Sequence, residues 1–320
     1  LTVVGGVRWE DTYIATDVDA ADGNDGAAKV LNVRTNPDTP FFQSADGINA
    51  GNPEANMTLD QLANAQLEQL DLLPAAGVIV DVYDNLKLRL NWSRTIGRPT
   101  FKEITPVKQQ DHLNGPKFAG NPNLQISQLE NYDLRLEWIP GDGQLLSASA
   151  FFKDVQDAID YAQRPAAGSQ PFIIPFNFDE GQVRGIELEA RQDLGAWFEW
   201  LRGVSVGANF TFLDAWVTVR DRDVRKIEEL LALRGKDPDD YDIAERPMKD
   251  QPEYLLNLFF LYENDRIGTS VGVFFNRSGE TLLAGEDANG DDYIANRVAM
   301  PYNSLDVSVT QNVFENFKIK

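Results

Sequence analysis

The connections between the extended segments of this chain are alternately short and long. Tight turns fall at residues 84–85, 140–143, 263–266 and 314–317, and connections of about 20 to 60 residues, with no regular length, lie between them. Antiparallel strands run alternately up and down, so turns at every second connection all lie at one end of a sheet. This separation of short turns from long polar loops predicts an antiparallel sheet whose two ends face different environments.

Period-two alternation of apolar and polar residues marks the strands of this sheet. Between residues 86 and 93, three leucines and Trp92 alternate with Lys, Arg, Asn and Ser, and segments 131–138, 185–191, 204–212 and 305–309 repeat the pattern. The expected strands are residues 1–16, 75–83, 86–96, 128–139, 144–154, 177–192, 203–218, 252–263, 267–277 and 302–312, with an eleventh that begins near 317. Consecutive strands pair in sequence order, so no parallel crossover is needed.

The cost of placing charge in lipid assigns the two faces of these strands. An arginine or lysine on the lipid face near the bilayer midplane costs roughly 2 to 4 kcal/mol. We therefore expect the polar face to line a wet lumen, and its members are Lys87, Arg89, Asn91, Arg135, Glu137, Glu187, Glu189 and Arg191. Aromatic residues near strand ends, such as Trp9, Trp138 and Tyr254, suit an interfacial girdle.

These patterns predict an all-β fold, an antiparallel up-and-down transmembrane β-barrel with short periplasmic turns and long extracellular loops. The long loops are expected near residues 17–74, 97–127, 155–176, 219–251 and 278–301. Two of them contain helix-like stretches. Thr58 begins a capping-box pattern that leads into Leu62, Leu67 and Leu70, and residues 224–234 have helical periodicity with Gly235 as a stop. A soluble, adhesin-like β-domain remains an alternative, because its strands also alternate.

Composition excludes several classes of function. The 50 acidic residues outnumber the 29 basic ones, for a net charge of −21, which argues against binding to nucleic acid. The chain has no cysteine and one histidine, His112, so thiolate and multi-histidine metal sites are excluded. No nucleophile–base arrangement or phosphate loop is present in the sequence, and we expect no enzymatic activity.

Acidic loops offer candidate ligands for a hard cation. The candidates are Asp17, Asp19, Asp22 and Asp25 in one loop and Asp287, Asn289 and Asp291 in another. Calcium binds clustered carboxylates and carbonyls on a loop turned by glycine. Neither loop has a glutamate at the twelfth position, where Ala28 and Val298 stand instead. A solvated acidic loop and a calcium loop therefore both remain open, and no other cofactor is expected.

Six stretches, taken in order, resemble the C-terminal half of the barrel of TonB-dependent outer-membrane receptors. They are LKLRLNWSRTIGRPTFKEITP (86–106), GNPNLQISQLENYDLRLEWIP (120–140), LLSASAFFKDVQDAI (145–159), GQVRGIELEARQDLG (181–195), DQPEYLLNLFFLYEN (250–264) and SLDVSVTQNVFENFKIK (304–320). The resemblance implies about half of a 22-stranded barrel, corresponding to strands 11 to 21, that closes around an N-terminal plug. We expect residues 1–320 to be a partial barrel domain without the plug, the TonB-binding segment or the closing strand.

This resemblance also implies uptake of a scarce solute across the bacterial outer membrane, with energy supplied by the TonB complex of the inner membrane. A ferric siderophore, cobalamin and an oligosaccharide are the candidate ligands. The candidate ligand-binding residues are Arg94, Arg98, Lys102, Arg164, Arg277 and Arg297, with the aromatics Phe41, Phe42, Phe172, Phe176 and Tyr293. Arginines suit an anionic chelate and aromatics suit sugar rings. The alternative is a passive porin-like or structural outer-membrane barrel without energy coupling.

Overall fold

A computed structural model shows the architecture of the chain. It describes residues 1–320 apart from 18–63, 106, 111–114, 116, 167–168, 220, 241–242, 286, 290–291, 295, 315–316 and 320. Within this described part, no helix has the length and apolarity needed to cross a membrane.

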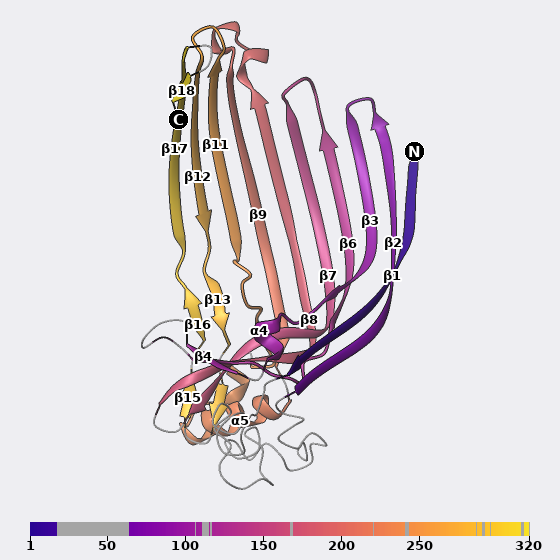
Figure 1. Ribbon diagram of the computed structural model, residues 1–320, viewed down its shortest axis with the longest axis vertical. Helices are drawn as coiled ribbons and strands as arrows, with labels where there is room; N and C mark the ends of the chain where they lie inside the picture. Colours follow the sequence, from indigo (N-terminus) through magenta and orange to yellow (C-terminus); the bar gives the residue numbers. More distant parts are fainter. Residues whose placement is uncertain are drawn as a thin grey trace.

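One antiparallel sheet dominates the described residues. Its strands follow the order β1-β2-β3-β6-β7-β8-β9-β11-β12-β17-β18, so neighbours in the sheet are also neighbours along the chain apart from short excursions (Figure 1). The bounds are β1 Thr2–Asp17, β2 Asn64–Tyr83, β3 Leu86–Gly97, β6 Ser127–Trp138, β7 Leu145–Ala166, β8 Ser169–Asp193, β9 Val204–Thr218, β11 Tyr254–Asn264, β12 Thr269–Ser278, β17 Tyr302–Phe314 and β18 Phe317–Ile319. The predicted up-and-down order is confirmed. β1 and β18 form the two edges, and the sheet is open between them.

The two ends of the sheet differ as the connection lengths predict. The short connections lie together at the top of Figure 1, at Asp84–Asn85, between β6 and β7, and between β11 and β12. The apolar connection from β8 to β9 joins them as two 3₁₀ turns, Leu194–Ala196 and Glu199–Leu201. We call this the short-turn end and the opposite one the long-loop end.

Small elements gather at the long-loop end, at the bottom of Figure 1. They are α4 Phe101–Ile104, β4 Lys108–Gln110, β5 Lys117–Ala119, α5 Asp221–Leu233, the 3₁₀ turn Pro238–Asp240, β10 Glu245–Pro247, β13 Thr281–Ala284, β14 Asp287–Asn289, β15 Asp292–Ile294 and β16 Arg297–Ala299. The predicted helix at 224–234 is confirmed by α5, which buries Ile227. It stops where predicted, because Gly235 has a positive φ of 67° and Lys236 N–H donates to the Leu231 carbonyl at 2.9 Å.

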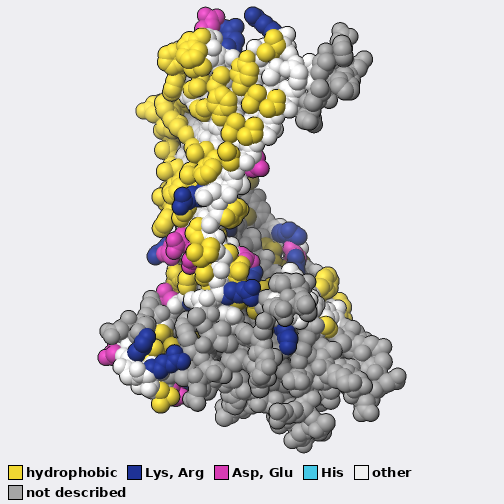
Figure 2. Space-filling view, turned by 90° about the vertical axis from the view of Figure 1, so that its left-hand side faces the viewer, with side chains coloured by type: hydrophobic (Ala, Val, Ile, Leu, Met, Phe, Trp, Pro, Cys, Tyr) yellow, Lys and Arg dark blue, Asp and Glu magenta, His cyan; other side chains and the backbone are white. Residues whose placement is uncertain are grey.

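Strand register places the apolar residues on one continuous face. Leu88 lies opposite Leu136, and Leu188 lies opposite Phe210. Many of these side chains are exposed, among them Leu136 and Leu188, at 43% and 48%. Figure 2, which views the sheet from the β17 side, shows apolar side chains covering most of its upper part, with charged side chains at the top edge and below them. An apolar face left exposed over this area suits a hydrocarbon surrounding.

Three of the predicted strands, β2, β7 and β8, are much longer than the sequence indicates. β2 begins at Asn64, not at residue 75, and pairs with β1 along its whole length. Leu67 and Leu70 therefore lie in a strand, and the helix prediction is wrong for them. Leu67 pairs with Ile14 and Leu70 with Asp11. The two leucines are three positions apart in the strand, so they lie on opposite faces of the sheet. Thr58 and Leu62 lie outside the described residues.

The predicted loop at 155–176 is also wrong in its conformation. β7 and β8 run through it as a hairpin that continues past the ends of the neighbouring strands. The local signal for this extension is weak because residues 155–166, VQDAIDYAQRPA, do not alternate regularly between apolar and polar. Beyond residue 157 the hairpin packs against the other long connections, and Ala158, Asp160 and Ala162 are buried there.

Candidate functional site

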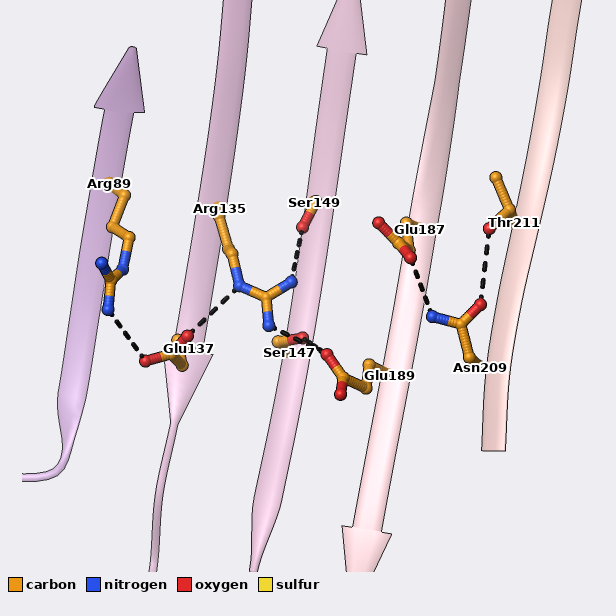
Figure 3. A network of polar contacts seen from close by, with 9 residues as sticks. All are labelled: Arg89, Arg135, Glu137, Ser147, Ser149, Glu187, Glu189, Asn209 and Thr211. Carbon is orange, nitrogen blue, oxygen red and sulfur yellow. Dashed lines mark hydrogen bonds and ion pairs between the residues drawn. The ribbon is translucent and has the colours of Figure 1, made fainter. Parts of the chain in front are cut away.

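A network of charged and polar side chains crosses the polar face of the sheet, from β3 to β8 (Figure 3). Arg135 is its centre, and donates from Nε to Glu137 at 3.2 Å, from Nη1 to Ser149 at 3.2 Å and from Nη2 to Glu189 at 2.9 Å. Arg89 reaches the second oxygen of Glu137 at 3.2 Å. Both carboxylates of this network, Glu137 and Glu189, contact a guanidinium, so neither is left as a free acid or base for catalysis.

This network brings together four of the residues predicted to line the lumen: Arg89, Arg135, Glu137 and Glu189. Glu187 belongs to a second, smaller group, in which it accepts from Asn209 Nδ2 at 2.8 Å.

The other three predicted residues share the same face by register. Lys87 lies opposite Glu137, Asn91 opposite Asp133, and Arg191 opposite Leu145. All eight therefore lie on the face opposite the exposed leucines.

A buried ion pair lies beyond the apolar face, at the long-loop end. Asp160 of the extended β7 is completely buried, and Arg246 of β10 is 4% exposed. Arg246 Nη2 lies 3.5 Å from Asp160 Oδ1, and the backbone N–H of Lys249 donates to Oδ2 at 3.0 Å. Burial raises the pKa of the Asp160 carboxyl, and Arg246 opposes this shift. The pair anchors the β9–β11 connection to β7.

Tyr161, the next residue, anchors a second connection. Its hydroxyl donates to Glu103 Oε1 of α4 at 2.7 Å. Burial and this bond raise the pKa of the Tyr161 phenol, because both disfavour the phenolate. The other oxygen of Glu103 caps α4 by accepting from Thr100 N–H at 2.7 Å. One glutamate therefore both completes a capping box and ties the β3–β6 connection to β7.

A third connection meets the same part of β7, at Tyr161 and Gln163. Gly285 N–H, between β12 and β17, donates to the Tyr161 carbonyl at 2.8 Å, and its own carbonyl accepts from Gln163 N–H at 3.1 Å. A Cβ at Gly285 would lie 2.4 Å from Arg246 Cζ, so any side chain there would displace the buried guanidinium. We call Glu103, Asp160, Tyr161, Arg246 and Gly285 the loop platform.

The segment with sequence GNPNL adds to the rigidity of this end. Asn121 N–H donates to the Glu103 carbonyl at 2.6 Å, and Asn121 Nδ2 donates to the Pro175 carbonyl of β8 at 3.1 Å. A Cβ at Gly120 would lie 1.9 Å from the Thr105 carbonyl oxygen. The β3–β6 connection is thus held against both strands of the long hairpin.

The predicted ligand-binding residues do not form one cluster. Arg94 and Arg277 lie by register on the apolar face, where Arg94 pairs with Glu130 at 2.6 Å and Arg277 Nε donates to Tyr254 OH at 3.0 Å. Arg98 follows β3 and pairs with Glu10 and Thr12 of β1. Arg94 and Arg277 therefore lie on the apolar face, near the long-loop ends of β3 and β12.

Lys102, Phe176 and Arg297 are the other predicted residues whose side chains the structure describes. Lys102 Nζ lies 4.8 Å from the Phe118 ring centroid, Phe176 packs in the apolar cluster around Phe178, and Arg297 is exposed on β16. Arg164, Phe172 and Tyr293 lie in β7, β8 and β15, but their side chains lie outside the described part. Phe41 and Phe42 lie outside it entirely.

The residues of the loop platform were not among the predicted site residues. Asp160 stands in the run Ala158-Ile159-Asp160-Tyr161-Ala162, and an acid inside an apolar run is a signal of a paired buried charge. Its partner Arg246 lies 86 positions further on, in a polar stretch without such a signal. The acid was therefore identifiable and its partner was not.

The calcium prediction falls mainly on residues beyond the described part. Asp19, Asp22, Asp25 and Asp291 lie outside it, Asp17 ends β1, and Asp287 and Asn289 belong to β14. Among the described residues, no group of three or more His, Cys, Asp or Glu side chains is placed to hold a metal ion. The calcium sites stay a prediction.

Comparison with known proteins defines the family. The family model described as TonB dependent receptor-like, beta-barrel, matches residues 1–319. The chain belongs to this family of bacterial outer-membrane receptor barrels. Family members are receptors and transporters, so the chain is not an enzyme, and the sequence prediction of fold and family is confirmed.

Curated relatives cover different members of the family. The probable hemoglobin and hemoglobin-haptoglobin-binding protein 3 of Haemophilus influenzae is 26% identical over 181 residues, which are 53% of this chain and 16% of that protein. The vitamin B12 transporter BtuB of Photobacterium profundum is 30% identical over 112 residues, 34% of this chain and 16% of that protein. The chain thus spans about a sixth of the length of these relatives.

Solved structures support the fold. A ferric enterobactin receptor of Pseudomonas aeruginosa aligns with a TM-score of 0.50 at 14% identity, over 80% of this chain and 35% of that one. The siderophore receptor PirA of Acinetobacter baumannii gives 0.51 at 13% identity, over 79% and 36%. At this identity the likeness concerns the fold alone.

Proposed function

We propose that this chain is part of the barrel of an outer-membrane receptor that captures a scarce solute and imports it with energy delivered through TonB. The long-loop end would face the outside and the short-turn end the periplasm. The observation that carries this proposal is the loop platform, in which three long connections are fixed to one extended hairpin. Connections fixed before a ligand arrives lose less conformational entropy when they bind it, as a capture surface requires.

The ligand classes that fit are a ferric siderophore, cobalamin and an oligosaccharide. The names of the relatives include a hemoglobin-binding protein and a vitamin B12 transporter, which favours an iron- or cobalt-containing ligand. Arg98, Lys102 and Arg297, near the long-loop end, are the cations we propose for an anionic chelate. Phe172, Phe176 and Tyr293 would contribute aromatic surface.

Uptake by the intact bacterium tests this function. The gene for the full-length protein would be deleted, and accumulation of radiolabelled ferric siderophores, haem, cobalamin and labelled oligosaccharides measured with and without a functional TonB. We expect uptake of one ligand to require both the protein and TonB. Uptake that needs the protein but not TonB would instead establish a passive pore, and no uptake defect for any ligand would contradict the proposal.

A further inference from the structure

A groove of about 540 Å³ lies on the apolar face of the sheet, towards the short-turn end. Its floor is formed by small residues on three adjacent strands: Ala148 of β7, Ala190 of β8 and Ala208 of β9. Its sides include Trp138 and Phe210. Ala190 and Ala208 are direct cross-strand partners, so the floor is continuous from one strand to the next. The volume is within the range of pockets that hold a small organic molecule.

We propose that this groove binds one acyl chain of a phospholipid of the periplasmic leaflet. This inference rests on the membrane placement in the proposed function. The groove is continuous with the exposed leucines of the apolar face, including Leu136, Leu146 and Leu188, all of which line it. An acyl chain seated against alanine contacts the walls on both sides, and so buries more apolar surface than a chain lying on a leucine ridge.

The neighbouring turn supplies groups suited to the phosphate and ester parts of that lipid. β8 ends at Asp193, just beyond Ala190, and the 3₁₀ connection that follows carries Trp197 and Trp200, which are 65% and 81% exposed. Indole N–H groups donate hydrogen bonds at the headgroup level of a bilayer. Arg202, on the same connection, has a side chain that is 74% exposed, and its positive charge complements a lipid phosphate although it also contacts Glu199.

A lipid fits the groove better than a protein partner does. Eleven residues line the groove, whereas a specific protein interface uses roughly 20 to 30 residues on each side. The groove therefore offers enough apolar surface for one chain of a lipid, and too little by itself for a stable dimer.

Filling the floor of the groove tests the proposal. Full-length Ala190→Leu, Ala208→Leu and wild-type protein would be purified from outer membranes in mild detergent, and retention of deuterated palmitoyl-oleoyl phosphatidylethanolamine titrated by native mass spectrometry. Ala150→Leu is the matched control, because Ala150 lies on the same apolar face of β7, opposite Leu134 and Ile186, but does not line the groove. We expect one tightly retained lipid in wild type and in the control, and about tenfold weaker retention in the two groove variants, the effect of losing contact with about two methylene groups.

Equal retention in all four proteins, or retention of detergent only, would overturn the proposal. Heat-modifiable migration in gels shows for each variant that a barrel has formed, so a folding defect is recognised independently. A protein that forms no membrane barrel would contradict the proposed function as well. A protein that forms the barrel and transports its ligand, but retains lipid equally in every variant, would contradict the lipid groove alone.

Discussion

At the scale of single residues, the burial of Asp160 and Arg246 is the most consequential feature. Two ions without solvent are stabilised only by each other and by the groups that hydrogen-bond to them. Asp160 has the Lys249 and Tyr161 backbone N–H groups as further donors, and Arg246 donates to the carbonyls of Tyr161 and Pro247 at 3.2 Å each. Removing either partner leaves the other charged and buried.

Truncation of Arg246 should therefore loosen the loop platform. We expect Arg246→Ala to destabilise this end by about 3 to 5 kcal/mol, since it leaves Asp160 without its counter-ion. Arg202→Ala is the control, because its pair with Glu199 is exposed and contributes about 0 to 1 kcal/mol. Hydrogen exchange of amides 158–163 would report the loss of stability, and unchanged protection in Arg246→Ala would contradict the assigned role.

Gly285 makes a second prediction at the same scale. Its missing side chain leaves room for the guanidinium of Arg246, and overpacking a buried site costs about 1 to 3 kcal/mol. We expect Gly285→Ala to lower the midpoint of thermal unfolding of the long-loop end. Gly6→Ala is the control, because a Cβ at Gly6 meets nothing within 4 Å. A loss of equal size in both variants would show that packing against Arg246 is not the cause.

At the scale of the strand, the alternation of faces decides what each position tolerates. Leu90 and Asn91 are adjacent on β3, yet Leu90 pairs with Leu134 on the apolar face and Asn91 with Asp133 on the polar face. An arginine introduced at position 90 should therefore face lipid, whereas an arginine introduced at position 91 should face the carboxylate of Asp133.

Arginine substitutions at these neighbours test the assignment of faces. We expect Leu90→Arg to destabilise the folded barrel by roughly 2 to 4 kcal/mol near the bilayer midplane. Asn91→Arg should cost much less, because Asp133 is opposite and the face is polar. Urea unfolding of the full-length protein in lipid vesicles measures both variants. A larger loss for Asn91→Arg than for Leu90→Arg would reverse the faces.

At the scale of the whole molecule, the sheet has two unpaired edges. Within the described residues β1 pairs only with β2, and β18 only with β17. Unpaired edges expose backbone donors and acceptors, which hydrocarbon cannot satisfy. A polypeptide restricted to these 320 residues should thus form oligomers in detergent through its edges. Light scattering would measure this, and a monodisperse monomer with heat-modifiable migration would contradict it.

Strand order and faces were predictable because each depends on local alternation or on turns close in sequence, whereas the family was predicted from the resemblance of six stretches in order. Leu86 to Ser93 shows its two faces without any knowledge of its neighbours. The extent of β2 and the long β7–β8 hairpin were not predictable, since they depend on pairing with β1 and on packing against distant connections. Asp160 and Arg246 show the same limit, because the chain gives no sign of which basic residue covers the acid.

The network around Arg135 has a consequence for anything that moves along the polar face. Arg89 and Arg135 carry two positive charges, and Glu137 and Glu189 two negative ones, all within one chain of contacts. Their fields largely cancel at distances greater than the separation of the charges, so this network exerts little net attraction or repulsion on an ion that passes at such a distance. A charged cargo would meet no electrostatic trap there, and its release would not be slowed by the wall.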